Sequence, residues 1–318
     1  MTHLSVREQS DRPSRGEATP PRPRAGRAGG AGRWREAVAG WLFVTPNLVL
    51  LAVFLFLPLF LVFKLSFQQA STFGPAKWIG FDNYRDLLGD EVFWRVLLNT
   101  AIFTVATVPA SIAIGLVLAV LLNKAMPARP LFRTIIYLPI VISGLVTSMI
   151  GLLMFDEGIG VLNGVLQELG LGSLHWQTDG ALAMVSVVLM TMWTRIGFAM
   201  VIYLAGLQDI PAEVYEAADL DGASSWQQFR RVTTPMLGGS TLFLVVMNMI
   251  WSFQVFDVVY VMTNGGPGYD TSMLVLYAYD EGFGPSRDFG YGSTIGVVLF
   301  VITLALAIVQ VRRSERAA

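Results

Sequence analysis

The chain has 318 residues and no cysteine; 54% of its residues are hydrophobic and only 14% are charged. An ordinary soluble domain carries about 25% charged residues, so this composition excludes a soluble enzyme of normal surface, and the lack of cysteine excludes a disulfide-stapled secreted domain. The 22 basic and 23 acidic residues nearly cancel, to a net charge of −1, so the overall charge does not indicate a nucleic-acid partner.

The first 36 residues differ in composition from the rest of the chain. Residues 1–36 are rich in Arg, Pro, Gly and Ala, and such a segment buries too little apolar surface to fold. We expect a disordered cytoplasmic tail there, and a transmembrane domain over residues 37–318. The tail either helps to set the membrane topology or binds lipid or a partner protein.

Six long stretches of the chain carry almost no charge. A helix needs about 20 apolar residues to cross a bilayer core about 30 Å thick. We therefore predict an all-α polytopic membrane protein with six transmembrane helices, at residues 39–63, 98–122, 134–155, 181–205, 237–261 and 293–311. The first apolar run is far longer than the core of a signal peptide.

The basic residues predict the orientation of these helices. With the N-terminus in the cytoplasm, sixteen of the lysines and arginines fall on the cytoplasmic side and five on the outer side. The positive-inside rule then places both termini in the cytoplasm, which agrees with an even number of spans.

Two charged residues fall inside the predicted spans. Arg195 lies near the middle of the fourth span, and Asp257 lies near the outer end of the fifth. A charge at this depth costs about 2.5–3.5 kcal/mol and usually faces the bundle interior or a cavity. Arg195 therefore either lines a translocation path or is a structural partner of a carbonyl or carboxylate group.

The fifth span also carries a repeated polar and aromatic pattern. Trp251, Gln254 and Asp257 recur every three residues, which places them on one face of a continuous helix. An aromatic ring with amide and carboxylate neighbours suits a sugar ring, but the same face also suits packing against another helix. The candidate residues of a substrate path are thus Arg195, Trp251, Gln254 and Asp257.

The loop at residues 206–235 carries the signals of two short helices. Pro211 and Glu213 are typical of a helix start, and Gly222 is typical of a left-handed helix stop. Ser224 and Gln227 then form the pattern of a capping box. From these residues alone, the loop is either a docking surface for a partner or a plain connection between two spans.

Within this loop the chain resembles a known family. Glu216-Ala217-Ala218, Gly222 and the segment Val232 to Pro235 resemble the "EAA" signature of the inner-membrane permease subunits of ABC importers. The extended pattern resembles the carbohydrate-uptake branch that includes maltose and glycerol-3-phosphate permeases. Val232 and Thr234 depart mildly from the usual Ile and Leu. Further similar segments lie at 132–139, 205–211, 253–257, 263–268 and 289–292, so the resemblance covers about residues 40–312.

This resemblance implies a type I ABC importer permease fold in the cell membrane of a prokaryote. It implies that the loop is a coupling helix that docks on a separate ATPase subunit, through Glu216, Ala217, Ala218, Asp221, Gly222 and Ala223. It further implies three kinds of protein partner: ATPase subunits, a second homologous permease subunit and an extracytoplasmic solute-binding protein. The cargo would be a sugar or sugar-like solute: an oligosaccharide, an amino sugar, glycerol-3-phosphate or a glycerophosphodiester.

The chain lacks the motifs of an ATPase or another enzyme. None of its three lysines stands in a Gly-Lys-Ser/Thr context, so it has no P-loop. Its two histidines, His3 and His175, belong to no metal-ligand pattern. We expect no cofactor in this chain, and ATP with Mg²⁺ in the partner ATPase. The alternatives are a secondary transporter or channel that works alone, and a membrane-bound enzyme.

Overall fold

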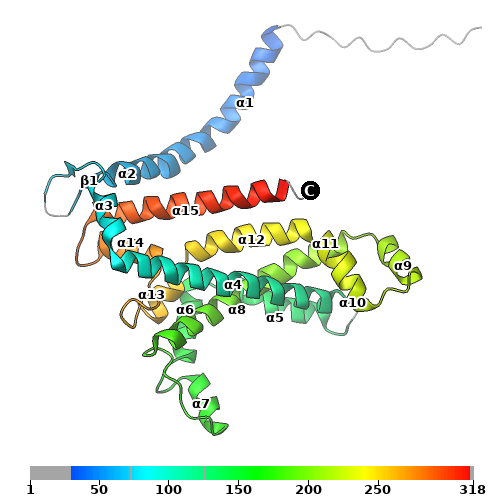
Figure 1. Cartoon of the computed structure of the whole chain (residues 1–318). Helices are drawn as coiled ribbons and strands as arrows, with labels where there is room; N and C mark the ends of the chain where they lie inside the picture. Colours follow the sequence, from blue (N-terminus) through cyan, green and yellow to red (C-terminus); the bar gives the residue numbers. More distant parts are fainter. Residues whose placement is uncertain (1–29, 72–73, 125, 316–318) are drawn as a thin grey trace, which may run out of the picture. The chain divides into compact units, whose positions relative to one another are not determined.

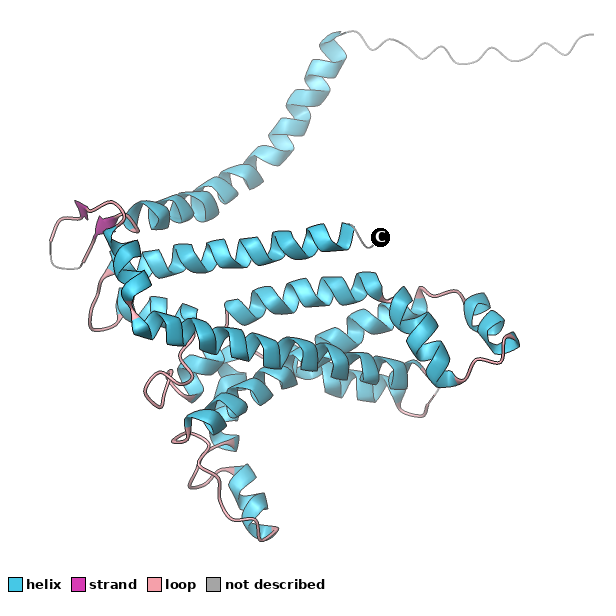
Figure 2. Ribbon diagram, in the orientation of Figure 1, coloured by secondary structure: helices cyan, strands magenta, loops and turns pink. Residues whose placement is uncertain are grey.

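The computed structural model describes residues 30–71, 74–124 and 126–315. Helices make up most of this part of the chain (Figures 1 and 2). The chain divides into two compact units, one ending at Leu57 and one beginning at Pro58, which are described separately.

The described part of the first unit is one helical run. It consists of α1 (Gly30–Leu51), the π-helical turn η1 (Ala52–Phe56) and the first residue of α2 (Leu57–Leu65). Because α1 begins at Gly30, the helix extends into residues 30–36, which the composition assigned to the tail. Residues 1–29 of the predicted tail lie outside the described residues.

The second unit begins with the rest of α2, continues through two short strands and then becomes a helical bundle (Figure 1). Strands β1 (Gln68–Gln69) and β2 (Lys77–Trp78) pair antiparallel. The helices that follow are α3 (Asp82–Gly89), α4 (Glu91–Asn123), α5 (Arg129–Val141), α6 (Gly144–Met154), α7 (Val161–Glu168), α8 (Gly180–Gln208), α9 (Ala212–Leu220), α10 (Ser225–Gln228), η2 (Phe229–Thr233), α11 (Thr234–Met236), α12 (Gly238–Phe253), α13 (Asp257–Met262), α14 (Leu274–Phe283) and α15 (Phe289–Glu315).

Among the described residues, four helical segments are long and apolar enough to cross a membrane. They are Val38–Leu65, Glu91–Asn123, Gly180–Gln208 and Phe289–Arg312, and they match four of the predicted spans within a few residues at most ends. The other two predicted spans correspond to bent helix pairs, so the described residues give six spans only if each pair counts as one.

The predicted span over residues 134–155 is present as a bent helix pair and not as one continuous helix. The segments Arg129–Val141 and Gly144–Met154 meet at an angle of 101°. Pro139 lies inside the first segment and has no N–H to donate, which weakens the helix there. Ile142 and Ser143 then take extended ψ angles of 140° and 139° before α6 begins.

The predicted fifth span over residues 237–261 is also interrupted. Helix α12 ends at Phe253, and α13 begins only at Asp257. At the start of the span, the helical segments Ser225–Met236 and Gly238–Phe253 meet at 65°. The consequence for the substrate-path residues is described below.

Close helix crossings hold the centre of the second unit together. Helix α4 packs along α8 and α12, and α8 also packs against α5 and α6. A side chain at Gly115 would lie 2.5 Å from the Cβ atom of Ala199, and one at Gly197 would lie 2.9 Å from the Cα atom of Tyr137. Small residues at such points let apolar helices approach closely.

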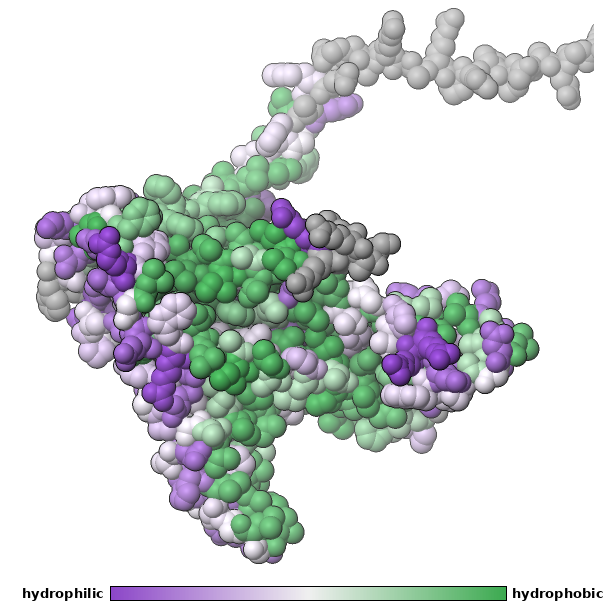
Figure 3. Space-filling view, in the orientation of Figure 1, coloured by the Kyte–Doolittle hydropathy of each residue, from purple (hydrophilic) through white to green (hydrophobic). Residues whose placement is uncertain are grey.

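The surface of the second unit matches this arrangement. Hydrophobic residues cover the sides of α4, α12 and α15, whereas hydrophilic residues gather around α3 and around α9 to α11, at opposite ends of these helices (Figure 3). An apolar belt between two polar ends is what a bilayer requires of a helical bundle.

Candidate functional site

The predicted helix stop at Gly222 is confirmed. Helix α9 ends at Leu220, and Gly222 has a φ of +72°. The Gly222 N–H donates to the carbonyl of Asp219 and the Ala223 N–H donates to the carbonyl of Ala218, both at 3.0 Å. This pair of hydrogen bonds is a Schellman motif, which satisfies the last carbonyls of the helix.

The predicted capping box is confirmed as well. The Ser224 N–H donates to Gln227 Oε1 at 2.8 Å, and the Gln227 N–H donates to Ser224 Oγ at 3.4 Å. Gln228 then joins the two short helices, because its Nε2 donates to Asp219 Oδ1 at 2.5 Å and to the carbonyl of Ala223 at 3.2 Å. The turn between α9 and α10 is therefore fixed by its own hydrogen bonds.

The turn presents its signature residues outward. Glu216, Ala217, Asp221 and Gly222 are exposed, whereas Ala218 and Ala223 are half-buried. Nothing lies within 4 Å of the position a Gly222 side chain would take. Leu220 beside it is 90% exposed, so the turn is a protruding surface with an apolar side chain that nothing in the second unit covers.

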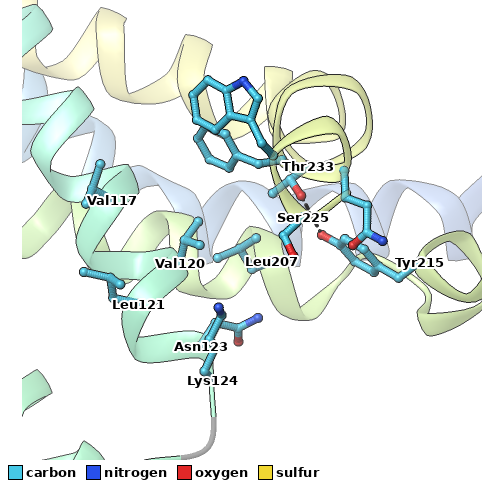
Figure 4. A pocket seen from close by; sticks show the side chains of 12 residues that line it. Val117, Val120, Leu121, Asn123, Lys124, Leu207, Tyr215, Ser225 and Thr233 are labelled. Carbon is cyan, nitrogen blue, oxygen red and sulfur yellow. Dashed lines mark hydrogen bonds between the residues drawn. The ribbon is translucent and has the colours of Figure 1, made fainter. Parts of the chain in front are cut away.

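A cavity of about 480 Å³ lies between this loop and the end of α4. Figure 4 shows Val117, Val120 and Leu121 on the α4 side, with Tyr215 and Thr233 facing them from the loop. The Tyr215 and Thr233 hydroxyls hydrogen-bond at 3.0 Å. This bond joins α9 to η2, which continues through α11 towards α12.

The structure places Arg195 in a buried polar cluster. Its Nη1 donates to Ser252 Oγ at 2.7 Å and to the carbonyl of Asn248 at 3.4 Å, both on α12. The Ser252 hydroxyl also lies 3.3 Å from the Thr107 hydroxyl of α4. Arg195 therefore has the structural partners that were one of the two alternatives.

Arg195 also borders open space, as the other alternative requires. It lines a cavity of about 460 Å³ together with Trp251, Thr194, Thr147, Gly144 and Val258. Trp251 is half-buried, and its ring packs against Phe198 with a centroid distance of 5.1 Å. Two of the four predicted substrate-path residues thus share one cavity wall.

The prediction that Trp251, Gln254 and Asp257 share one helical face is wrong. Helix α12 ends at Phe253, so Gln254 is its C-terminal cap and Asp257 is the first residue of α13. The Asp257 carboxylate lies against the backbone of Gly144, at the start of α6. Gln254 is exposed, and neither it nor Asp257 lines the cavity of Arg195.

Reasoning from the sequence missed a polar stripe on α4. Thr100, Thr104, Thr107 and Ser111 are all buried, and they recur at helical spacing along an otherwise apolar span. That spacing is a signal the sequence contains, because it marks one helix face as turned towards other helices. Thr107 of this stripe supplies the α4 side of the polar cluster around Arg195.

A second polar cluster lies around Asp90, the residue just before α4. Asp90 Oδ1 accepts from the Val92 N–H at 2.8 Å, and Oδ2 accepts from the Tyr291 hydroxyl at 2.8 Å and from the Tyr277 hydroxyl. Burial raises the pKa of Asp90, but the hydrogen bonds outweigh burial and leave the pKa below its ordinary value. The cluster ties α4 to α14 and α15.

The loop around α7 is fixed by one carboxylate. Glu157 accepts from the backbone N–H groups of Gln177 and Thr178, each at 2.8 Å, and from the Thr178 hydroxyl at 2.9 Å. These hydrogen bonds, the backbone ones first, lower the pKa of Glu157 to about 2. His175 lies 3.3 Å from the same carboxylate, so it is part of this loop structure.

Apolar helices of bilayer length, an internal polar cluster and a protruding helical turn together define a multi-pass membrane protein. Residues 111–316 match the family described as the binding-protein-dependent transport system inner membrane component. The chain belongs to this family.

Curated relatives cover nearly the whole chain. A probable ABC transporter permease of Bacillus subtilis is 37% identical over 284 residues, which is 87% of this chain and 96% of that protein. The trehalose/maltose transport permease of Thermococcus litoralis is 32% identical over 281 residues, 88% of this chain and 95% of that protein. The lactose transport permease of Rhizobium radiobacter is 37% identical over 278 residues, which is 86% of this chain and 93% of that protein.

A solved structure has the same fold. It is a bacterial ABC transporter involved in the import of the acidic polysaccharide alginate, with a TM-score of 0.79, 25% sequence identity and coverage of 89% of this chain and 98% of that chain. The predicted family and fold class are therefore confirmed, as is the multi-pass location in a prokaryotic cell membrane. The family is the membrane permease of the transporter, so the alternatives of a lone secondary transporter, a channel or an enzyme are not favoured.

Proposed function

We propose that this chain forms half of the translocation path of an ATP-driven importer for a sugar or sugar-like solute. The relatives support this class of cargo, since their names refer to trehalose and maltose, lactose, and arabinooligosaccharides. The cavity lined by Arg195 and Trp251 supports it from this chain's own residues, because an aromatic face with polar neighbours suits a sugar ring. Oligosaccharides, amino sugars, glycerol-3-phosphate and glycerophosphodiesters belong to the candidates.

The observation that carries the coupling role is the exposed turn between α9 and α10. Its backbone is fixed by the Schellman motif and the capping box, while the side chains of Glu216, Ala217 and Asp221 point outward. A preorganised protrusion loses little conformational entropy when it docks. We assign Glu216, Ala217, Ala218, Asp221, Gly222 and Ala223 to docking on a partner ATPase, which binds the ATP and Mg²⁺.

A continuous set of contacts joins this turn to the cavity of Arg195. The Tyr215–Thr233 hydrogen bond joins α9 to η2, and the chain continues from η2 through α11 into α12. Helix α12 carries Asn248 and Ser252, which hold Arg195. A rigid-body shift of the turn is thereby passed to the cavity wall, which is how a domain-scale movement changes access to a site.

The remaining partners follow from the function of the family. A second, homologous permease subunit completes the path, and an extracytoplasmic solute-binding protein delivers the cargo, with membrane lipid around the bundle. Both termini lie in the cytoplasm, as the distribution of basic residues indicates.

ATP-dependent uptake into proteoliposomes tests this proposal. The complete complex, with its ATPase, second permease and solute-binding protein, should import labelled oligosaccharide, and the import should stop without ATP. A complex that assembles and hydrolyses ATP but imports no carbohydrate would contradict the assigned cargo class.

A further inference from the structure

We infer that the cargo carries an anionic group and that Arg195 binds this group during passage. The inference rests on the proposed function and narrows it to acidic carbohydrates, whose carboxylate, sulfate or phosphate groups are each a match for a guanidinium. Arg195 uses some of its hydrogen-bond donors within the protein and leaves others free to bind a ligand.

In the described part of the chain, one nitrogen of the Arg195 guanidinium makes hydrogen bonds. Nη1 donates to Ser252 and to the Asn248 carbonyl, and within the described residues neither Nε nor Nη2 makes a hydrogen bond. These two nitrogens are also absent from the fully buried polar atoms that lack a partner, so neither is fully buried. Arg195 lines the cavity of about 460 Å³, and we assign the free edge of its guanidinium to this cavity. The Nε and Nη2 edge is the fork that binds a carboxylate with two parallel hydrogen bonds.

Among the described residues, Arg195 has no salt-bridge partner. Arg stays protonated in proteins, and within the described part of the chain no carboxylate lies within 4 Å of it. The groups around it on α4 and α12 are neutral: the Thr107 and Ser252 hydroxyls and the backbone carbonyl of Asn248. Neutral partners satisfy hydrogen bonds but leave the positive charge uncompensated at a depth where a charge is expensive.

Asp257 does not act as the counter-ion of Arg195. Its carboxylate lies against Gly144, the first residue of α6, where the positive end of the helix dipole and the free N–H groups stabilise a negative charge. Ser143 provides no side-chain cap there. Asp257 is thus accommodated at the start of α6, while Arg195 remains available for an anion in the cavity.

The rest of the cavity wall suits the carbohydrate part of such a cargo. Trp251 offers an indole ring, and Thr194 and Thr147 lie on the same wall. A cavity of about 460 Å³ falls in the range of small-molecule sites. The combination of one guanidinium, one indole and two threonines fits a sugar residue that carries an acidic substituent.

The test compares two labelled probes in proteoliposomes that contain the complete transporter: an oligouronate and a neutral oligosaccharide of the same length. The wild type should import the oligouronate. Arg195→Gln should lower this import about 10- to 100-fold, the loss expected for charge-assisted hydrogen bonds, and Arg195→Lys should retain part of it. Arg85→Gln is the matched control, because Arg85 is an exposed arginine of α3 paired with Asp82, and it should import normally.

The outcomes separate this inference from the proposed function. Import of the neutral probe alone, or equal import of the oligouronate by wild type and Arg195→Gln, would overturn the anionic cargo and leave the sugar importer intact. Import of neither probe by a complex that hydrolyses ATP would overturn both. If Arg195→Gln does not assemble, Ser252→Ala is the deciding variant. It keeps the charge of Arg195 but removes the hydroxyl that accepts from Nη1, so the KM for the oligouronate should rise. An unchanged KM would contradict the inference.

Discussion

Arg195 of α8 and Ser252 of α12 are joined by a hydrogen bond of 2.7 Å between Nη1 and Oγ. The bond connects Arg195, in the wall of the 460 Å³ cavity, to α12. Helix α12 follows the α9–α10 turn in the chain, after η2 and α11. The part of the molecule expected to meet the ATPase and the part expected to meet the cargo are therefore linked through α12. Four further consequences of the structure are open to direct test.

Replacing Gly222 by valine should uncouple transport. The φ of +72° at Gly222 costs a residue with a side chain about 1–2 kcal/mol, and the space around it is open, so the substitution distorts the turn without a clash. ATP-dependent uptake should fall strongly while membrane insertion stays normal. Gly164→Val is the control, because Gly164 also has open space around it but no positive φ. Normal uptake and normal ATPase association in Gly222→Val would refute the coupling role.

Removing the cap of α10 should loosen the turn locally. Ser224→Ala loses the side-chain oxygen that accepts from the Gln227 N–H, which costs about 0.5–2 kcal/mol at a helix start. Hydrogen exchange should become faster in residues 212–228, with little change in the melting temperature of the whole protein. Ser224→Asp keeps an acceptor and should exchange like the wild type. Equal exchange in all three proteins would show that the cap does not hold the turn.

The Asp90 cluster should make stability depend on pH in acid. The pKa of Asp90 is lower in the folded protein than the ordinary value of 3.8. The ionised Asp90 carboxylate therefore stabilises the fold fully above pH 3.8, and this stabilisation is lost as the pH falls through the folded-state pKa. Asp90→Asn can still cap α4 but has no charge to titrate, so the loss of melting temperature between pH 5 and pH 3 should be smaller than in the wild type. Asp82→Asn, at an exposed carboxylate of α3, is the control. Parallel melting curves for wild type and Asp90→Asn would contradict this account.

The crossing of α4 and α8 should not tolerate a larger residue. A side chain at Gly115 would lie 2.5 Å from the Cβ atom of Ala199, and overpacking of this kind costs about 1–3 kcal/mol. Gly115→Ala should lower the melting temperature and the yield of the transporter, and the added change Ala199→Gly should restore part of both. A destabilisation that Ala199→Gly leaves untouched would mean that the two residues are not the point of contact.

The sequence predicted best those features that depend on local chemistry. The stop at Gly222 and the cap at Ser224 follow from backbone rules within a few residues, and both are present. Four unbroken spans follow from long apolar runs that carry almost no charge. The breaks after Val141 and Phe253 were missed because hydropathy measures how apolar a segment is and not the path of its backbone.

The prediction of the site residues was limited in the same way, because the sequence does not show where a helix breaks. Arg195 was identified because a charge in a membrane span is rare and costly. The expected face of Trp251, Gln254 and Asp257 failed because it assumed an unbroken helix, whereas α12 ends at Phe253. Which residues share the cavity depends on how α5, α6, α8 and α12 pack, and this was not readable from residue spacing.

The central claim is that the α9–α10 turn docks on an ATPase subunit, and cross-linking measures it directly. The chain has no cysteine, so Ala217→Cys introduces a single reactive site on the exposed turn, and Gly164→Cys introduces one on α7 as a control. In the complete transporter, a short bifunctional reagent should join Ala217→Cys to the ATPase subunit and should not join Gly164→Cys to it. If Ala217→Cys gives no product with the ATPase in a complex that transports, or if both variants give the same product, the turn is not the docking site.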